Sequence, residues 1–187
     1  MNQIRNICAN IVVIMTILVF SSTNINSGEW ADRRVWVGLD MFQSFLAADK
    51  NIKNKKDVDG KLQVVLVYYD RESLAKEMAY HLENKVREIR GIPLKAEITT
   101  TNLLPDHEIT AGIFLCQKIE DKEIFDNVIQ FGHDNEVITF SPFSGDVERG
   151  MNGVYIADII LPYVNIDSIN QSNIKLKKFF LKISKQL

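Results

Sequence analysis

The apolar positions of the chain repeat first at helical spacing and then in strand-length runs. Val35, Leu39, Phe42 and Leu46 recur at intervals of four, three and four residues, which predicts one face of an α-helix. A lysine-rich and aspartate-rich stretch then breaks this pattern and predicts a solvated loop. The run KLQVVLVYYD, residues 61–70, is continuous, apolar and rich in valine and tyrosine, so it predicts a buried strand.

A second helical stripe follows this strand directly. Its apolar positions are Leu74, Met78, Leu82, Val86 and Ile89, and Gly-Ile-Pro ends the pattern. The spacing therefore predicts a helix that continues as far as Ile89. A strand that leads into a helix of this length indicates a βαβ crossover.

The middle of the chain continues to alternate strand and helix patterns. We expect strands at residues 94–100, 111–117 and 136–141, and a helix that begins on acidic residues at 121–132. Runs of valine and isoleucine without regular polar alternation indicate strands covered on both faces. The sequence therefore predicts a single α/β domain with a mainly parallel sheet of about five strands flanked by helices.

The C-terminal part has a different pattern. The run VYIADIILPYVN is too long for one ordinary strand and contains Pro162, which predicts a hairpin that turns near Ala157 and Asp158. Two helical pieces joined at Asn173 follow it. In the second we expect Ile174, Phe180 and Ile183, or their neighbours, to face inward. Its outward positions carry Lys175, Lys177, Lys178, Lys182 and Lys185, which favour a solvated face, with a membrane-surface role as the alternative.

The N-terminal residues indicate export. Arg5 precedes an apolar core at residues 11–20 and a polar run of small residues, which is the layout of a secretory signal peptide. An uncleaved anchor is the alternative, but ten apolar positions fall short of the ~20 that a membrane-spanning helix needs. We predict a signal peptide at residues 1–27, cleavage between Ser22 and Gly28, and a mature domain at residues 28–187.

Composition limits the kinds of partner and chemistry that we expect. After loss of Arg5 the chain keeps 21 basic and 24 acidic residues and has no long basic run before its C-terminus, so we expect no nucleic-acid partner. Cys116 is then the single cysteine, and its apolar surroundings predict a buried structural thiol. Core packing must stabilise this domain without an internal disulfide.

We find no motif that predicts catalysis, a cofactor or a metal. His81, His107 and His133 are isolated in the sequence, and the segment PDHE around His107 favours a solvated loop over a metal site. There is no G-x-S-x-G segment, and no serine and histidine are placed so that we would expect them to meet. We therefore expect a protein that is not an enzyme.

The segment FSGDVERGMNG, residues 143–153, is rich in glycine and charge. A strand pattern follows its glycines, and Asp146 and Glu148 would repel an anion, so it does not predict a phosphate site. Gly145, Gly150 and Gly153 suit positive φ or close approach. We expect its apolar residues to pack onto the core rather than meet a partner. The loop as a whole nevertheless suggests a partner-binding surface at the sheet edge, formed by Asp146, Glu148, Arg149 and Met151.

The C-terminal third resembles the YfiR-like family of small periplasmic proteins. The matching segments are VITFS, GDVERGMNG, YVNIDSINQSN and IKLKKFFLKIS, in the family's order and spacing. The likeness extends over about residues 30–187 and is specific for 136–185. The chain departs from the family at Asn152, where an apolar residue is usual, and at Asn173, where glycine is usual. Its hairpin lacks the Asp-Gly turn, and the mature chain lacks the cysteines of the best-known relative.

This resemblance implies an exported, non-enzymatic regulatory protein. It would bind the periplasmic part of a membrane signalling protein, such as a diguanylate cyclase or a sensor kinase, and tune its activity; homodimerisation stays open. The alternative is a periplasmic small-ligand-binding module, because a parallel sheet offers a crevice beyond the carboxyl ends of its strands. That crevice would lie near the loops after Tyr69, Gln117 and Phe140.

Overall fold

The computed structural model describes residues 26–106, 108, 109 and 111–187. The chain divides into two units, Met1–Arg34 and Val35–Leu187, and the second unit contains every strand of the described residues. Only residues 26 and 27 of the predicted signal peptide are described, so the rest of that prediction lies outside the described residues. None of the described helices combines the length and the apolar character that a bilayer span requires.

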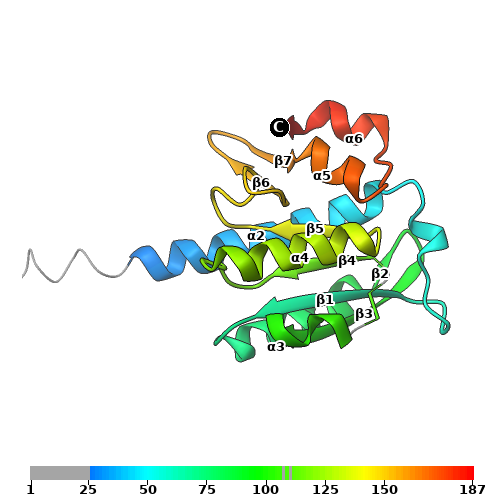
Figure 1. Ribbon diagram of the computed structural model, residues 1–187, viewed down its shortest axis with the longest axis horizontal. Coiled ribbons are helices and arrows are strands. Elements are labelled where there is room, and N and C mark those ends of the chain that lie inside the picture. The colour runs from blue at the N-terminus through cyan, green and yellow to red at the C-terminus, as the bar shows by residue number, and fades with distance from the viewer. Residues whose placement is uncertain (1–25, 107, 110) are drawn as a thin grey trace, which may run out of the picture. The chain divides into compact units, whose positions relative to one another are not determined.

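The described residues form one sheet of eight strands in the order β2-β3-β1-β4-β5-β6-β7-β8 (Figure 1). The strands are β1 (Leu62–Tyr68), β2 (Glu88–Ile89), β3 (Ile92–Thr100), β4 (Gly112–Leu115), β5 (Ile138–Ser141), β6 (Asn152–Ile156), β7 (Ile160–Val164) and β8 (Lys185–Gln186). Strands β3, β1, β4, β5 and β6 are parallel to one another. The predicted α/β class and mainly parallel sheet are confirmed. The strand count exceeds the predicted five because the hairpin and two short edge strands extend the sheet.

Helices cover both faces of this sheet. They are α2 (Asn26–Ala48), α3 (Glu72–His81) with a π-turn at Leu82–Val86, α4 (Lys122–Asp134), α5 (Ile166–Gln171) and α6 (Lys178–Ile183), with 3-10 turns at Ile52–Asn54 and Thr101–Asp106. From Val35 onward, α2 packs with α3 on one face, and α4 packs on the other. The sheet is therefore a doubly covered layer, as the unbroken apolar runs predicted.

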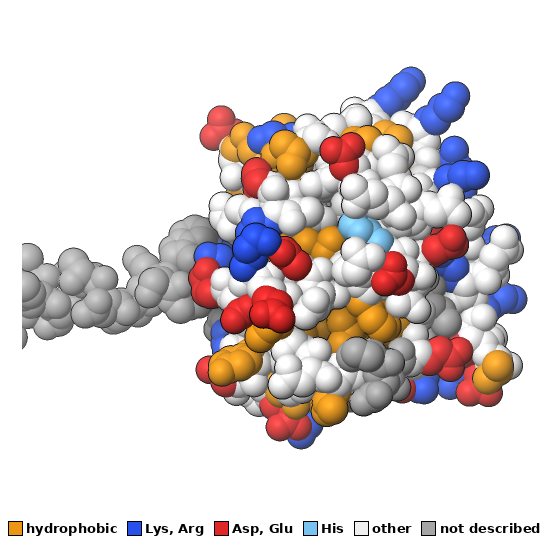
Figure 2. All heavy atoms as spheres, viewed as in Figure 1, with side chains coloured by type: hydrophobic (Ala, Val, Ile, Leu, Met, Phe, Trp, Pro, Cys, Tyr) orange, Lys and Arg blue, Asp and Glu red, His pale blue; other side chains and the backbone are white. Residues whose placement is uncertain are grey.

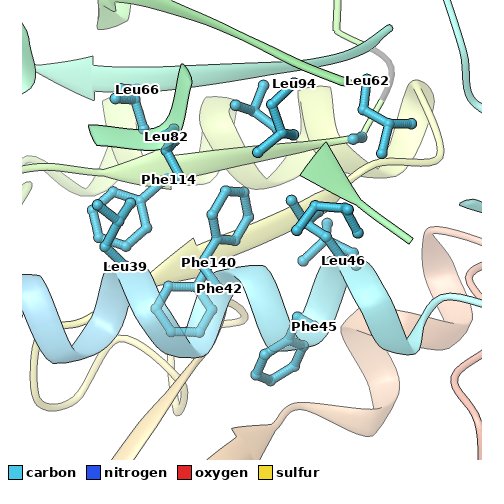
Figure 3. Packing of buried hydrophobic residues seen from close by; sticks show 14 of the residues in the cluster. Leu39, Phe42, Phe45, Leu46, Leu62, Leu66, Leu82, Leu94, Phe114 and Phe140 are labelled. Carbon is cyan, nitrogen blue, oxygen red and sulfur yellow. The ribbon is translucent and has the colours of Figure 1, made fainter. Parts of the chain in front are cut away.

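The alternation of side chains along the central strands explains the two-sided core. Val64 and Leu66 of β1 belong to the cluster with α2, whereas Val65 and Val67 belong to the cluster with α4. Figure 3 shows the aromatic centre of the first cluster, where Phe42 of α2 faces the rings of β4 and β5. Because successive strand residues point to opposite faces, a strand buried on both sides must be apolar throughout.

The predicted helix ending at Ile89 is wrong in its last turn. The π-turn stops at Val86, and Arg87 has a φ of 68°, which is the left-handed region that ends a helix. Ile89 instead lies in β2 and pairs with Ile92 in antiparallel register. Its side chain is buried all the same. After a tight turn, Ile89 is thus buried in a strand and not in a helix.

The C-terminal predictions are confirmed in part, because Lys177 and Lys185 are half-buried where a solvated face was predicted. Strands β6 and β7 form the antiparallel hairpin, and Asn173 joins the two helical pieces with a φ of 51°. Ile174 and Phe180 are buried as expected. Ile183 is 45% exposed, because it lies four residues after Phe179 on the face of α6 that turns away from the core.

Candidate functional site

The glycine loop, residues 143–153, connects β5 to β6 and has an unusual backbone path. Gly145 and Gly150 have φ values of 88° and 117°. A Cβ atom on Gly153 would lie 2.7 Å from Val147 Cγ2 and 2.8 Å from the carbonyl oxygen of Ser141. All three predicted roles of these glycines, positive φ or close approach, are confirmed.

The apolar side chains of the glycine loop pack inward. Val147 and Met151 are buried, and Met151 belongs to the cluster that contains the α4 side chains. Phe143 is half-buried and contacts both core clusters. The expectation that these residues fold onto the core is therefore confirmed.

A buried carboxylate organises the polar side of the loop. Asp146 is 0% exposed; one of its oxygens accepts a 2.6 Å hydrogen bond from Ser141 Oγ, and the other lies 3.1 Å from the Arg149 guanidinium. Burial raises the pKa of Asp146 above its ordinary value, and the bonds to Ser141 and Arg149 oppose that rise. The network ties the end of β5 to the middle of the loop.

Arg149 is held by more than this ion pair. Its Nη1 also donates a 2.9 Å hydrogen bond to the carbonyl oxygen of Ile119, and its guanidinium lies 3.5 Å from the centroid of the Phe125 ring. The side chain is 30% exposed. Arg149 therefore bridges the glycine loop to α4 and to the segment after β4.

The four predicted partner-binding residues do not form one surface. Asp146 and Met151 are buried and cannot meet a partner in this conformation, which corrects their placement on an exposed loop. The cause is the turn between Gly145 and Gly150, which directs both side chains toward the sheet. Glu148 is exposed and Arg149 is half-buried, so these two residues reach the surface. Partner binding through them stays a prediction.

Two buried asparagines hold the other side of the loop. Asn152 donates to the carbonyl oxygen of Thr139 (3.2 Å) and accepts from the backbone N–H of Asn165 (3.2 Å). Asn165 in turn donates to the carbonyl oxygen of Val147 (2.8 Å) and caps α5 through the N–H of Ser168. The amide of Asn152 thus satisfies buried backbone groups that an apolar side chain would leave unpaired.

The glycine loop continues into an exposed apolar hairpin. Tyr163 of β7 donates a 3.0 Å hydrogen bond to Glu148, which places Glu148 against the hairpin. At the hairpin tip Ile156 and Ile160 are exposed, and Ile159 is 61% exposed. We call Ile156, Ile159 and Ile160 the hairpin surface. Glu148 is not part of it, because Tyr163 and Ile160 point to opposite faces of β7. Figure 2 shows hydrophobic side chains at the upper left, where Figure 1 places this hairpin.

The apolar run around Pro162 predicts this hairpin but not the exposed surface at its tip. The signal was present in the turn itself, because a tight turn normally carries polar or small residues. Here isoleucines precede and follow Ala157 and Asp158, where they have no sheet face to pack against.

A separate pocket lies where a ligand crevice was expected. It has a volume of about 320 Å³, and its lining includes Val67, Tyr68, Tyr69, Thr101, Gln117 and Ile119. The strand order places it at the carboxyl ends of β1 and β4, between the crossover to β3 and the chain that proceeds to β5. We call it the switch-point pocket. The loops after Tyr69 and Gln117 form it, whereas the loop after Phe140 does not appear in its lining.

Gln117 occupies the backbone N–H groups that an anion in this pocket would need. Its Oε1 accepts hydrogen bonds from the backbone N–H groups of Tyr69, Asp70 and Arg71 at 2.8, 3.0 and 2.9 Å. These are the amides before α3 that would otherwise face an anion. The nearby charges are also engaged, since Lys118 pairs with Glu120 at 2.8 Å. The pocket is lined by apolar and aromatic side chains together with Lys118, Glu120 and Asp121, and its free backbone amides are occupied by Gln117.

One histidine meets a serine, contrary to our expectation. His133 Nε2 lies 3.3 Å from Ser168 Oγ, because α4 and α5 bring together residues 35 positions apart. Burial lowers the pKa of His133. Ser168 is itself buried in the first turn of α5, so its hydroxyl is not presented to a substrate in this conformation. The pair contributes to the packing of α5 on α4.

Cys116 is a free, buried thiol, as predicted. It follows β4 directly, and burial raises the pKa of its thiol to about 12. Among the described residues, no three His, Cys, Asp or Glu side chains converge in an arrangement that could hold a metal ion. His107 lies outside the described residues.

Comparison with known proteins finds neither a family model nor a curated protein that matches this chain.

Proposed function

We propose that this protein is an exported, non-enzymatic regulator that acts in the periplasm by binding the periplasmic part of a membrane signalling protein. The observation that carries the proposal is the hairpin surface, where exposed isoleucines precede and follow the turn. The likeness of the glycine loop, hairpin and terminal helices to the YfiR-like family supports it. The best-known relative in that family binds a diguanylate cyclase, and a sensor kinase is a second candidate for this chain.

The hairpin surface has the composition of a binding site. Ile159 is 61% exposed and lies between two further exposed isoleucines, and a contiguous exposed apolar patch marks an interaction surface. An isoleucine buried at an interface contributes about 1.5–3 kcal/mol. Three such residues can form the apolar centre of a modest interface.

The scaffold behind this surface is well braced. Tyr163 links the hairpin to Glu148, and the ring of Tyr155 lies 3.8 Å below the ammonium of Lys185. Asn165 holds the loop that carries Glu148. A surface that is already ordered loses less conformational entropy on binding, which favours affinity.

A binding measurement with purified proteins tests the proposal. The ligand is the periplasmic domain of a diguanylate cyclase or sensor kinase encoded beside this protein, and affinity is measured by calorimetry. We expect Ile159→Asp to weaken binding by about tenfold or more, because it places a charge in the apolar centre. Val58→Asp is the matched control, since Val58 is 96% exposed in a different loop. Equal binding by wild type and Ile159→Asp, or no binding by wild type, would contradict the proposal.

A second candidate function is the binding of a small, flat and uncharged molecule in the switch-point pocket. Its volume of about 320 Å³ suits a small ligand, and Tyr68 and Tyr69 offer aromatic faces. Gln117 already occupies the three amides that would bind a phosphate or carboxylate. Neutral ligands are therefore favoured over anionic ones.

Thermal-shift measurements with a panel of nucleosides test this second function. We expect at least one to raise the melting temperature of the wild type, and Tyr69→Ala to reduce that rise. Tyr80→Ala, at another exposed tyrosine outside the pocket, is the control. No shift with any nucleoside, or equal shifts in Tyr69→Ala, would count against a site of this chemistry.

A further inference from the structure

The last twenty residues carry charge of one sign only. Residues 168–187 contain five lysines and no aspartate or glutamate, although the whole chain has a formal net charge of −2. This segment folds into the end of α5, α6 and β8. The charge is therefore concentrated at one end of the sheet.

Three of these lysines are free, and the other two are not. Lys177 donates to the carbonyl oxygen of Ala47 (2.8 Å), and Lys185 lies over the Tyr155 ring. Lys175, Lys178 and Lys182 are exposed and form no ion pair with any described residue. Other exposed lysines of the described chain, such as Lys53 and Lys56, also form no ion pair, but acidic residues stand near them in the sequence. The C-terminal segment differs because no acid occurs in its twenty residues.

Apolar side chains project from α6, the helix that carries Lys178 and Lys182. Phe179 is 72% exposed and Ile183 is 45% exposed, and their spacing of four residues places them on one face of α6. Lys178 and Lys182 lie one position before each of them, on the adjacent face. Figure 2 shows Lys and Arg side chains extending at the upper right, where Figure 1 places α6.

We propose that Lys175, Lys178, Phe179, Lys182 and Ile183, here called the cationic cap, bind the surface of an anionic lipid bilayer. The lysines would lie among the lipid phosphates, and the two apolar side chains would enter the boundary between headgroups and acyl chains. An exposed aromatic ring flanked by lysines is the pattern of side chains that settle at a membrane interface. Each lysine near an anionic surface adds to the attraction.

The charge and shape of the cap favour lipid over the other occupants. A second copy bound through the same cap would bring two sets of unpaired lysines together. The cap also projects outward, and none of the three described pockets includes a cap residue, so a protein partner would have to supply the whole complementary shape. A bilayer surface needs no matching groove.

This inference goes beyond the proposed function and does not depend on which protein the hairpin surface binds. The two surfaces share one edge of the sheet, because α6 packs against β7 and β8 pairs with β7. A protein held to the bilayer by the cap would keep the hairpin close to the membrane. That placement suits a membrane partner.

Vesicle co-sedimentation of the exported protein tests the cap directly. The probes are vesicles of phosphatidylcholine alone, and vesicles in which about a third of the lipid is phosphatidylglycerol. We expect binding to the anionic vesicles only, and we expect salt to release it. The double variant Lys178→Glu/Lys182→Glu should lose about tenfold or more of this binding, and Phe179→Ser should lose part of it.

Control variants distinguish the effect of the cap residues from the effect of net charge. Lys53→Glu/Lys56→Glu makes the same change in net charge on two exposed lysines of another loop, and Val58→Ser is the control for Phe179→Ser. Lys178→Gln/Lys182→Gln repeats the test with a smaller change if reversal alters folding. Equal sedimentation with both kinds of vesicle, none with either, or equal loss in the control variants would overturn the inference. The inference would also be wrong if the cap variants bound anionic vesicles as well as the wild type does but lost binding to a purified acidic protein.

Discussion

Ser141 Oγ donates a 2.6 Å hydrogen bond to the fully buried carboxylate of Asp146, five residues further along the chain. This contact turns the first half of the glycine loop toward the sheet. An ionised buried carboxylate needs several partners, and Asp146 has the Ser141 hydroxyl and the Arg149 guanidinium. The loop therefore depends on charge compensation inside the protein as well as on its glycines.

Arg149 is expected to be essential for the stability of this loop. Arg149→Leu would leave Asp146 without its cationic partner, and it would also remove the bond to the Ile119 carbonyl and the contact with Phe125. We expect the free energy of unfolding to fall by about 1–3 kcal/mol. Urea denaturation measures this loss. Glu148→Gln, at the exposed neighbour, should change stability by less than about 0.5 kcal/mol; a similar fall in both variants would refute the assignment.

Asp146 should also make stability depend on pH. Burial raises its pKa above the ordinary value of 3.8, so the folded protein holds this proton more tightly than the unfolded chain. Its stabilising contribution is complete below pH 3.8 and is lost as pH rises through the folded-state pKa. As pH rises through this range, the unfolding free energy of the wild type should therefore fall relative to that of Asp146→Asn. A difference that is constant, or that moves toward the wild type with rising pH, would show that burial does not dominate.

Cys116 should be unreactive in the folded protein. Its thiol is buried and its pKa is about 12, so almost no thiolate is present at neutral pH. We expect a maleimide reagent to label it only at the rate of unfolding, and rapidly in denaturant. Cys116→Ser should lower the free energy of unfolding by roughly 1–3 kcal/mol, because a hydroxyl would be buried in an apolar site. Fast labelling of the native thiol would contradict this account.

Two glycines of the same loop should respond differently to alanine. In Gly153→Ala the new methyl group would lie 2.7 Å from Val147 and 2.8 Å from the Ser141 carbonyl oxygen, so we expect a loss of about 2 kcal/mol or more. Gly145 has positive φ but nothing within 4 Å of its would-be Cβ, so Gly145→Ala should cost only about 1 kcal/mol of backbone strain. Melting temperatures of the two variants test the order, and the reverse order would rule out steric contact as the cause.

The sequence by itself determined the architecture, because most of its signals are local. The stripe from Val35 to Leu46 predicts a helix with one buried face. The unbroken apolar run before Tyr69 predicts a strand with two buried faces. Pro162 and the length of its run required a hairpin. Asn173 was recognisable as a joint, since asparagine adopts the left-handed region more readily than most residues.

Only the tertiary structure decided which of the charged and apolar loop residues are exposed. Asp146 is buried because the glycine loop turns its carboxylate toward Ser141, and Ile159 is exposed because it lies at the tip of the hairpin. Neither fact follows from residue type or spacing. Exposure depends on which distant segment covers a side chain, and that is settled by long-range packing of the kind that brings His133 to Ser168 and Gln117 to the amides before α3.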